Sequence, residues 1–348
     1  MLGLVDTERS WMVGFERLIL ATGARDLVLG FAGWNQPGVM GAQAFHALLA
    51  RYDALASRRV LILGSGELAL DTALQAQARG IEVAGLVETL STVQGSLTLE
   101  TQVRDAGIAI FCDTVISNTH GNIDGVNGAT LIMDGNPVSM MVTCDTICVA
   151  IGKVPATELL AASGAQPDET ITLTGDAAGP APDMAYVQAW ARALGKHMTP
   201  DTVVCQCEEV TRADLLGVQP PHYLDRPAPM AARSLETLVA DGPAHPDQIK
   251  RLTRAGMGIC QGRRCREQVA CILAEATNIP VERIPVSSYR APVRPIPLSL
   301  LADWEESEAM IKGWDVWFGI PTQWTPYAIV GTAGEADHVS TVGGYSHV

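Results

Sequence analysis

The chain has 348 residues, of which 47% are hydrophobic, and its formal net charge at pH 7 is -14. A chain of this length can bury a large core, and its length predicts two or three compact units. Neutralising nucleic-acid phosphates requires a surplus of Lys and Arg in patches, and the sequence has no such patch. The composition therefore argues against a nucleic-acid partner and favours a small molecule or another protein.

The first segment of the sequence, residues 1–15, lacks the basic start and the apolar core that an export signal needs. No apolar run approaches the ~20 residues of a membrane span. We therefore expect a cytoplasmic protein without a membrane span. Because that compartment is reducing, the eight cysteines are candidates for metal binding rather than for disulfides.

The elements predicted near the start are a β-hairpin, a strand and a helix. Apolar patterning places the hairpin strands at residues 2–5 and 11–15, the next strand at 18–20 and the helix at 41–52. Farther along, the patterning predicts strands at 108–116, 129–133 and 139–149, and helices at 157–163 and 184–194.

A βαβ unit is the clearest local pattern between these two regions. A strand at residues 60–63 leads into the turn Gly64-Ser65-Gly66, which is followed by a helix to about Arg79 and a strand at 83–87. Such a turn aims backbone N–H groups and the positive helix end at a pyrophosphate. Glu88 ends the second strand, where a carboxylate favours NAD or another unphosphorylated adenosine. The alternative is a turn that only packs a helix on a sheet, in a domain kept as scaffold.

Four cysteines form two close pairs that can converge on one site from two loops. The pairs are Cys205 with Cys207, spaced C-x-C, and Cys260 with Cys265, spaced C-x4-C. Four thiolates suit either zinc or an iron–sulfur cluster, but paired zinc ligands usually have two residues between them. The uneven spacing therefore favours a [2Fe-2S] cluster.

The residues around the second cysteine pair bear on the properties of such a cluster. Glycines in this loop can turn N–H groups toward sulfide, which raises a reduction potential. Arg263 and Arg264 either add positive charge near the cluster or are solvated surface residues. No catalytic triad or paired-carboxylate arrangement stands out, so we predict no catalytic residue in this chain.

Several segments together resemble a known family of flavoprotein subunits. They are residues 18–24, 64–66, 175–176, 205–208 and 256–265. They resemble the FAD/NAD(P)-binding, [2Fe-2S]-containing subunit of the opine oxidase, hydrogen cyanide synthase and (hydroxy)proline dehydrogenase family, which is related to the sarcosine oxidase alpha subunit. The cysteine segment is similar to bacterioferritin-associated ferredoxin (BFD) domains.

The resemblance implies an α/β flavoprotein with two dinucleotide-binding domains, as in disulfide reductases, and a small helical BFD-like [2Fe-2S] domain. It implies that Thr22 and Gly23 lie against FAD and that Asp176, after Gly175, hydrogen-bonds the ribityl chain. The implied domains are an FAD-binding domain at 1–50 and 151–198, an NAD(P)-binding domain at 51–150, a [2Fe-2S] domain at 199–294 and a Trp-rich tail at 295–348.

One departure from the family concerns the start of the FAD-binding domain. The family begins with a strand, a Gly-x-Gly-x-x-Gly turn and a helix that hold the FAD pyrophosphate, whereas no such turn precedes Leu18 in this sequence. A βαβ unit needs ~30 residues. We therefore expect the first FAD βαβ unit to be missing, and a protein of this sequence to show cluster absorbance with substoichiometric FAD.

The function implied by the resemblance is that of an electron-transfer subunit in a heteromeric FAD-dependent dehydrogenase or oxidase. In such complexes an amine, amino acid or imino acid is oxidised on a separate subunit that is like glycine oxidase or D-amino-acid oxidase. A small ferredoxin-like subunit is a further expected partner. The alternative is a non-catalytic assembly subunit whose metal or cluster domain is structural.

Overall fold

The computed structural model describes residues 2–133, 135, 139–220, 233–243, 245–302, 308 and 332–334. The chain divides into two compact units, one of Met1–Phe15 with Ile296–Val348 and one of Glu16–Pro295. The predicted site residues all belong to the second unit. The tryptophans predicted to mark the tail, at positions 304, 314, 317 and 324, lie outside the described residues.

The first unit contains the predicted hairpin. Strand β1 (Leu2–Val5) pairs antiparallel with β2 (Ser10–Val13), and the Asp6 carboxylate accepts hydrogen bonds from the backbone N–H groups of Glu8 and Arg9 in the turn, both at 2.7 Å. A short helix, α11 (Leu298–Ala302), is the other described element of this unit.

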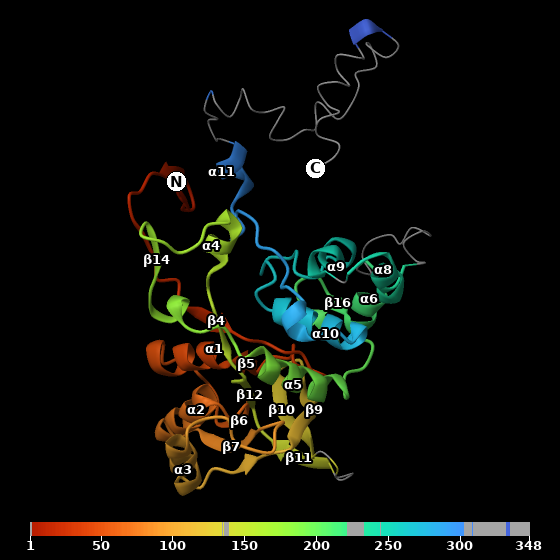
Figure 1. The fold of residues 1–348 in the computed structure, drawn as a ribbon. Coiled ribbons are helices and arrows are strands. Elements are labelled where there is room, and N and C mark those ends of the chain that lie inside the picture. Colours follow the sequence, from red (N-terminus) through yellow and green to blue (C-terminus); the bar gives the residue numbers. More distant parts are fainter. Residues whose placement is uncertain are drawn as a thin grey trace. The chain divides into compact units, whose positions relative to one another are not determined.

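The second unit contains a five-stranded parallel sheet, which lies close to helices α2 (Glu67–Ala78) and α3 (Leu97–Asp105) (Figure 1). Its strand order is β5-β12-β6-β7-β8. Every neighbouring pair is parallel, and most residues of the central strands β12 and β6 are buried, as is typical of a sheet covered on both faces. The strands are β5 (Val39–Gly41), β12 (Thr146–Val149), β6 (Arg59–Leu63), β7 (Glu82–Val87) and β8 (Ile110–Phe111).

Alternate residues of β6 face two different cores. Val60 and Ile62 pack against helices on one face, and Leu61 and Leu63 pack against an antiparallel meander on the other. The helices are α1 (Ala42–His46), which continues as one π-helical turn η1 (Ala47–Arg51), α2 (Glu67–Ala78) and α3 (Leu97–Asp105). The meander strands are β9 (Thr114–Asn122), β10 (Gly125–Met133) and β11 (Ser139–Thr143).

Two of the predicted strands are each divided in the structure. The stretch 108–116 breaks at Asp113, whose φ of +49° turns the chain from β8 into β9. The stretch 139–149 breaks at Asp145, whose carboxylate accepts hydrogen bonds from the backbone N–H groups of Arg58 and Arg59. The chain therefore leaves the meander at this point and enters the parallel sheet as β12.

Two small sheets each pair a strand that precedes this region with a strand that follows it. Strand β3 (Leu18–Leu20) pairs parallel with β14 (Ile171–Leu173), and β4 (Ala24–Asp26) pairs antiparallel with β13 (Lys153–Pro155). Helix α4 (Glu158–Ser163) lies between β13 and β14 in the chain. The 3-10 helix η2 (Gly175–Ala178) and helix α5 (Met184–Gly195) follow β14 and lead to the cysteine-bearing segment.

The cysteine-bearing segment is largely helical and shares a core with the rest of its unit. It contains β15 (Val203–Cys205), β16 (Val210–Thr211), α6 (Arg212–Leu216), α8 (Leu235–Asp241), α9 (Pro246–Thr253), α10 (Arg266–Thr277) and η3 (Val281–Arg283). Helix α10 packs on α5 through a continuous apolar cluster that includes Trp190 and Leu273.

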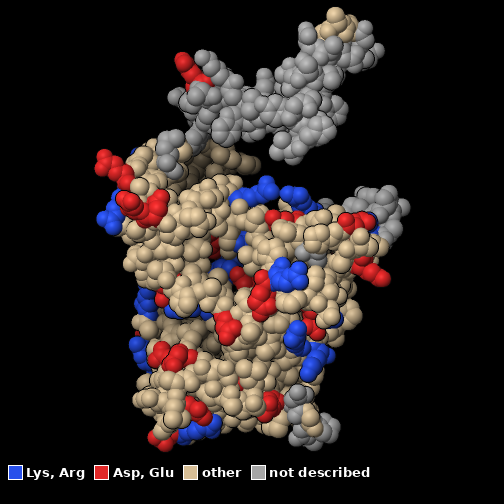
Figure 2. Space-filling model, viewed as in Figure 1, with Lys and Arg blue, Asp and Glu red and all other residues tan. Residues whose placement is uncertain are grey.

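The surface of the second unit carries charges of both signs. Figure 2 shows acidic and basic side chains interspersed on its visible face. Within the part of the chain that the structure describes, no helix combines the length and the apolar character needed to cross a membrane.

Candidate functional site

The four predicted metal-binding cysteines surround one cavity. Cys205 ends β15 and Cys207 lies two residues on, whereas Cys260 sits in a loop and Cys265 is the N-cap of α10. Gln206, Ile259 and Arg264 complete the lining of the cavity. The Sγ atoms of Cys205 and Cys207 are 4.0 Å apart, and those of Cys207 and Cys260 are 3.6 Å apart.

The glycines of the cysteine loop are required by close approach and by backbone conformation. The N–H of Gly256 donates a hydrogen bond to Cys205 Sγ at 3.4 Å. A Cβ atom added to Gly258 would lie 2.5 Å from Cys207 Sγ and 3.0 Å from Cys207 Cβ. Gly256 and Gly262 have φ values of +85° and +76°, which only glycine adopts without strain.

The thiols lie close enough to perturb one another. Cys207 lowers the pKa of Cys205, but Cys265 and burial raise that pKa more, to about 12. Hydrogen bonding to Cys207 and burial both raise the pKa of Cys260. A metal must therefore displace protons from these thiols when it binds.

The residues present fit an iron–sulfur cluster by their chemistry. They offer four thiols at one cavity and a backbone N–H, that of Gly256, which already donates to sulfur. They also offer a glycine cradle, which is the close approach of Gly258 to Cys207 and which a methyl group would fill. Among the described residues, however, no group of three or more His, Cys, Asp or Glu side chains is arranged so as to hold a metal ion. The cluster assignment therefore stays a prediction.

The two arginines of the loop differ in their surroundings. The Arg263 side chain is only 13% exposed; its Nε pairs with Glu158 Oε1 at 3.1 Å and its Nη1 donates to the Cys260 carbonyl at 3.1 Å. Arg264 is exposed and lies over the Trp34 ring, 5.3 Å from its centroid. Arg263 is therefore a buried structural contact of the loop, and Arg264 is the surface residue.

The close approach of Gly258 to Cys207 allows a specific prediction about iron binding. In a Gly258→Ala variant, the new methyl group is expected to displace Cys207 and to lower the iron content of the purified protein by more than half, with an overpacking cost of about 1–3 kcal/mol. Iron and sulfide analysis measures this effect. Gly242→Ala is the matched control, because a Cβ there meets no atom within 4 Å. Equal iron in both variants would contradict the close packing at Gly258.

The residues predicted to contact FAD lie together at one edge. Thr22 and Gly23 follow β3, and Gly175 and Asp176 follow β14, its parallel neighbour. In dinucleotide-binding folds the ligand lies outside the carboxyl ends of parallel strands, which is where these residues are. The Asp176 carboxylate pairs with Lys153 Nζ at 2.7 Å and is about half exposed, so it remains accessible.

This edge is tied to the chain segment that enters α4. The Thr22 hydroxyl donates to the Ala156 carbonyl at 2.6 Å, and the Ala156 N–H donates to the Gly23 carbonyl at 2.9 Å. Glu158, the first residue of α4, then contacts Arg263 in the cysteine loop. A short covalent and hydrogen-bonded path therefore connects the predicted FAD contacts with the predicted cluster loop.

The predicted nucleotide-binding turn is present as strand, turn and helix. Gly64, with φ +116°, directly follows β6, and a Cβ there would lie 2.6 Å from the Ala150 carbonyl oxygen. Gly66 is the N-cap of α2, and a Cβ there would meet no atom within 4 Å. The structure thus has the predicted order of strand, glycine turn and helix, and pyrophosphate binding at this turn stays a prediction.

Glu88 is buried completely and is already hydrogen-bonded. Its Oε2 accepts bonds from the hydroxyls of Ser65 at 2.5 Å and Tyr186 at 2.7 Å, and its Oε1 accepts one from the Leu90 N–H at 2.9 Å. Three of the roughly four acceptor positions of the carboxylate are therefore in use, and because Glu88 is 0% exposed, a ribose could reach it only if the surrounding chain moved. As arranged, Glu88 does not fit a ribose, and the predicted contact stays a prediction.

Tyr186 is a partner of this carboxylate that the sequence did not single out. Burial raises the pKa of the Tyr186 hydroxyl, and the Glu88 carboxylate raises it further, so the hydroxyl stays protonated as a donor. Tyr186→Phe is expected to cost about 1–3 kcal/mol of unfolding free energy, because a buried carboxylate loses a donor. Urea unfolding measures this cost. Tyr52→Phe, at an exposed tyrosine, should change it by less than about 0.5 kcal/mol, and equal effects would refute the bond's importance.

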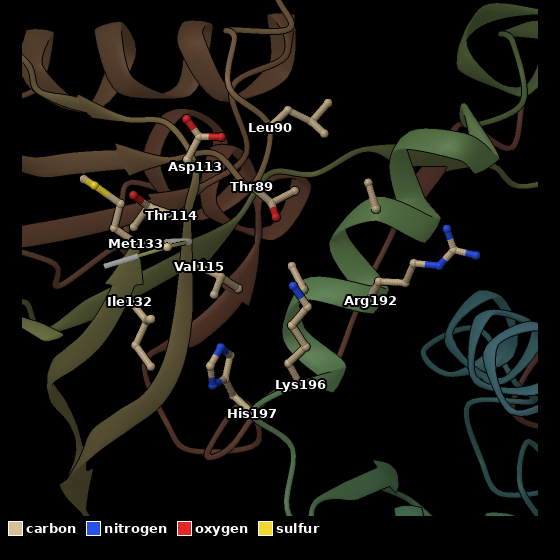
Figure 3. A pocket seen from close by; sticks show the side chains of 13 residues that line it. Thr89, Leu90, Asp113, Thr114, Val115, Ile132, Met133, Arg192, Lys196 and His197 are labelled. Carbon is tan, nitrogen blue, oxygen red and sulfur yellow. The ribbon is translucent and has the colours of Figure 1, made fainter. Parts of the chain in front are cut away.

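A cavity of about 690 Å³ is lined in part by residues that follow β7 and β8 in the chain, among them Thr89 and Asp113 (Figure 3). Thr89 and Leu90 follow Glu88 on one wall, and Lys196 and His197 come from the end of α5 on the other. Arg192 also lines it but is paired with Glu275 at 2.8 Å. The walls are mixed in polarity and do not define a ligand class.

Two family models match the chain. The model described as pyridine nucleotide-disulphide oxidoreductase matches residues 4–177, and the sarcosine oxidase A3 domain matches residues 221–304. The first match spans half of the chain. The chain therefore belongs to the pyridine nucleotide-disulphide oxidoreductase family, and its α/β fold is of the FAD/NAD-binding type.

Individual relatives agree with this assignment and with the resemblance drawn from the motifs. The chain is 23% identical to the alpha subunit of sarcosine oxidase from Rhizobium meliloti (strain 1021), over 84% of this chain and 32% of that protein. It is 25% identical to an opine oxidase subunit of the same strain, over 82% of this chain and 76% of that protein. The chain thus spans about a third of the first relative's length.

A solved structure shows the same fold. L-proline dehydrogenase from P. horikoshii superposes with a TM-score of 0.54 at 18% sequence identity, over 82% of this chain and 58% of that chain. At this identity, the similarity concerns the fold alone.

Proposed function

We propose that this chain is the electron-transfer subunit of a heteromeric FAD-dependent dehydrogenase or oxidase that acts on amines, amino acids or imino acids. The observation that carries the proposal is the cavity lined by Cys205, Cys207, Cys260 and Cys265, in the same unit as the FAD-type edge at Thr22 and Asp176. The substrate class is proposed from relatives named for sarcosine and opine oxidation.

When bound, FAD would exchange electron pairs with a substrate or another flavin, and a [2Fe-2S] cluster would pass electrons singly. The residues of this chain would hold these groups. Asp176 would accept hydrogen bonds at the carboxyl edge of β3 and β14, and the four thiolates would bind iron. The substrate would be oxidised on a partner flavoprotein of the glycine-oxidase type, so no residue here has a catalytic role.

The proposal is tested by purifying the chain with and without a glycine-oxidase-like partner. We expect about two iron and two sulfide per chain and an EPR signal on reduction. Dye reduction with sarcosine, proline or an opine should require both chains. A colourless protein with one zinc per chain, or turnover by the partner that is unchanged when this chain is omitted, would defeat the proposal.

A second candidate function is that of a non-catalytic assembly subunit. The hydrogen bonds of Ser65 and Tyr186 to Glu88 favour it, because they make the second dinucleotide turn an internally satisfied structural element. In that case NAD should not bind. Stable co-purification with the partner, without any effect of this chain on turnover, would select this candidate over the first.

A further inference from the structure

An arginine beside the cysteine loop is buried without a hydrogen-bond partner for much of its charged group. Arg266 is the first residue of α10, directly after Cys265, and is 2% exposed. Its Nε and Nη1 atoms are buried and have no hydrogen-bond partner among the described residues. Its guanidinium carbon lies 3.0 Å from the centroid of the Tyr289 ring. Leaving a buried cation unpaired costs several kcal/mol, so an anion close by is to be expected.

The nearby carboxylates are engaged by other arginines. Glu267 pairs with Arg25 at 2.5 Å, and Glu158 pairs with Arg263 at 3.1 Å. These two arginines and two glutamates balance one another in charge, which leaves Arg266 as an additional positive charge. Its position in the first turn of α10 adds to the cost, because the helix dipole is positive at that end.

The side chain of Arg266 lies against the loop that carries the cysteines. A Cβ on Gly262 would be 3.5 Å from Arg266 Nη2 and 3.6 Å from its Nε. A Cβ on Gly256 would be 3.5 Å from the Gly262 Cα and 3.8 Å from Cys265 Sγ. One packed cluster therefore runs from Arg266 through Gly262 and Gly256 to the Cys265 sulfur.

We propose that Arg266 compensates the negative charge of an iron–sulfur cluster held by Cys205, Cys207, Cys260 and Cys265, and thereby raises its reduction potential. This inference rests on the proposed function. Four thiolates make such a cluster an anion, and its negative charge grows by one when it accepts an electron. A cation held in a desolvated position stabilises the reduced form more than the oxidised form.

Arg266 differs from Arg263 and Arg264, the two arginines that the sequence placed near the predicted cluster. Arg263 is neutralised by Glu158, and Arg264 is exposed, so solvent and salt screen its charge. Neither is expected to affect the potential as strongly as a buried, uncompensated guanidinium. Arg266 is thus a potential-setting residue that acts on the cluster through its charge.

The test compares Arg266→Gln, Arg266→Lys and Arg264→Gln with the wild-type chain, using Arg283→Gln, an exposed arginine on η3, as the control. Iron and sulfide content, the EPR spectrum of dithionite-reduced protein and the midpoint potential are measured. Arg266→Gln should lower the potential by about 59 mV, which is a tenfold shift of a one-electron equilibrium. Arg266→Lys should retain most of the potential, Arg264→Gln should shift it less, and Arg283→Gln should not shift it.

A fully loaded Arg266→Gln protein with the potential of the control would overturn the inference and leave the proposed function intact. Loss of the cluster from Arg266→Gln but not from Arg266→Lys would support a role of charge. Loss from both would overturn it, because shape rather than charge would then be required. A wild-type protein without iron would overturn the proposed function and this inference with it.

Discussion

A Cys205→Ser variant is expected to lose at least nine-tenths of the iron that the wild-type chain carries. Cys205 is 1% exposed, it ends β15, and its sulfur accepts a hydrogen bond from Gly256. A serine oxygen has the wrong softness for iron–sulfur ligation and a shorter reach. Iron, sulfide and visible absorbance of the purified protein measure the loss.

The control for this experiment is Cys112→Ser. Cys112 is half-buried, accessible enough to tolerate a hydroxyl, and lies outside the four-thiol cavity. Its variant should keep the wild-type iron content. Full iron in Cys205→Ser, or equal losses in both variants, would show that the cavity is not the iron site.

An Arg25→Met variant is expected to lose about 3–5 kcal/mol of unfolding free energy. The Arg25 side chain is 13% exposed; its Nη2 pairs with Glu267 at 2.5 Å and its Nη1 donates to the Arg263 carbonyl at 2.7 Å. Burial lowers the pKa of Arg25, but Glu267 raises it more, so the group is charged. Removing the guanidinium leaves the buried Glu267 carboxylate without its partner.

Urea unfolding of Arg25→Met and of Arg192→Met tests this expectation. Arg192 pairs with Glu275 at 2.8 Å, but the two side chains are 60% and 56% exposed, so its loss should cost less than about 1 kcal/mol. The double variant Arg25→Met/Glu267→Leu should recover most of the stability, since neither member of this pair is then left buried without the other. Equal costs for the two single variants would refute the claim that burial makes the Arg25 pair important.

The local patterns of the sequence predicted the central βαβ unit and several elements around it, but they did not predict α3, β4, β13 or the separate helices of the cysteine segment. The turn at Gly64 to Gly66 is recognisable because a strand, a glycine turn and a helix follow one another within one short stretch. The predicted strand 139–149 was wrong as a single element, because the bonds that Asp145 accepts from Arg58 and Arg59 join segments almost ninety residues apart. Strand β5, at Val39–Gly41, was not predicted, because its pairing with β12 also joins distant segments.

The two cysteine pairs are recognisable as candidate ligands without any structure, because C-x-C and C-x4-C spacing is a local property of the chain, whereas their meeting at one cavity depends on tertiary packing. Which cations lie near them depends on tertiary packing. Arg263, Arg264 and Arg266 are close in sequence, yet one is paired with Glu158, one is exposed, and one is buried without a hydrogen-bond partner for two of its nitrogens. The sequence shows which residues are charged but not which of them are buried. Burial arises when helix α4 and the segment around Tyr289 pack against the cysteine loop. The strength of each charge then depends on that burial, because a charge acts more strongly where solvent is excluded.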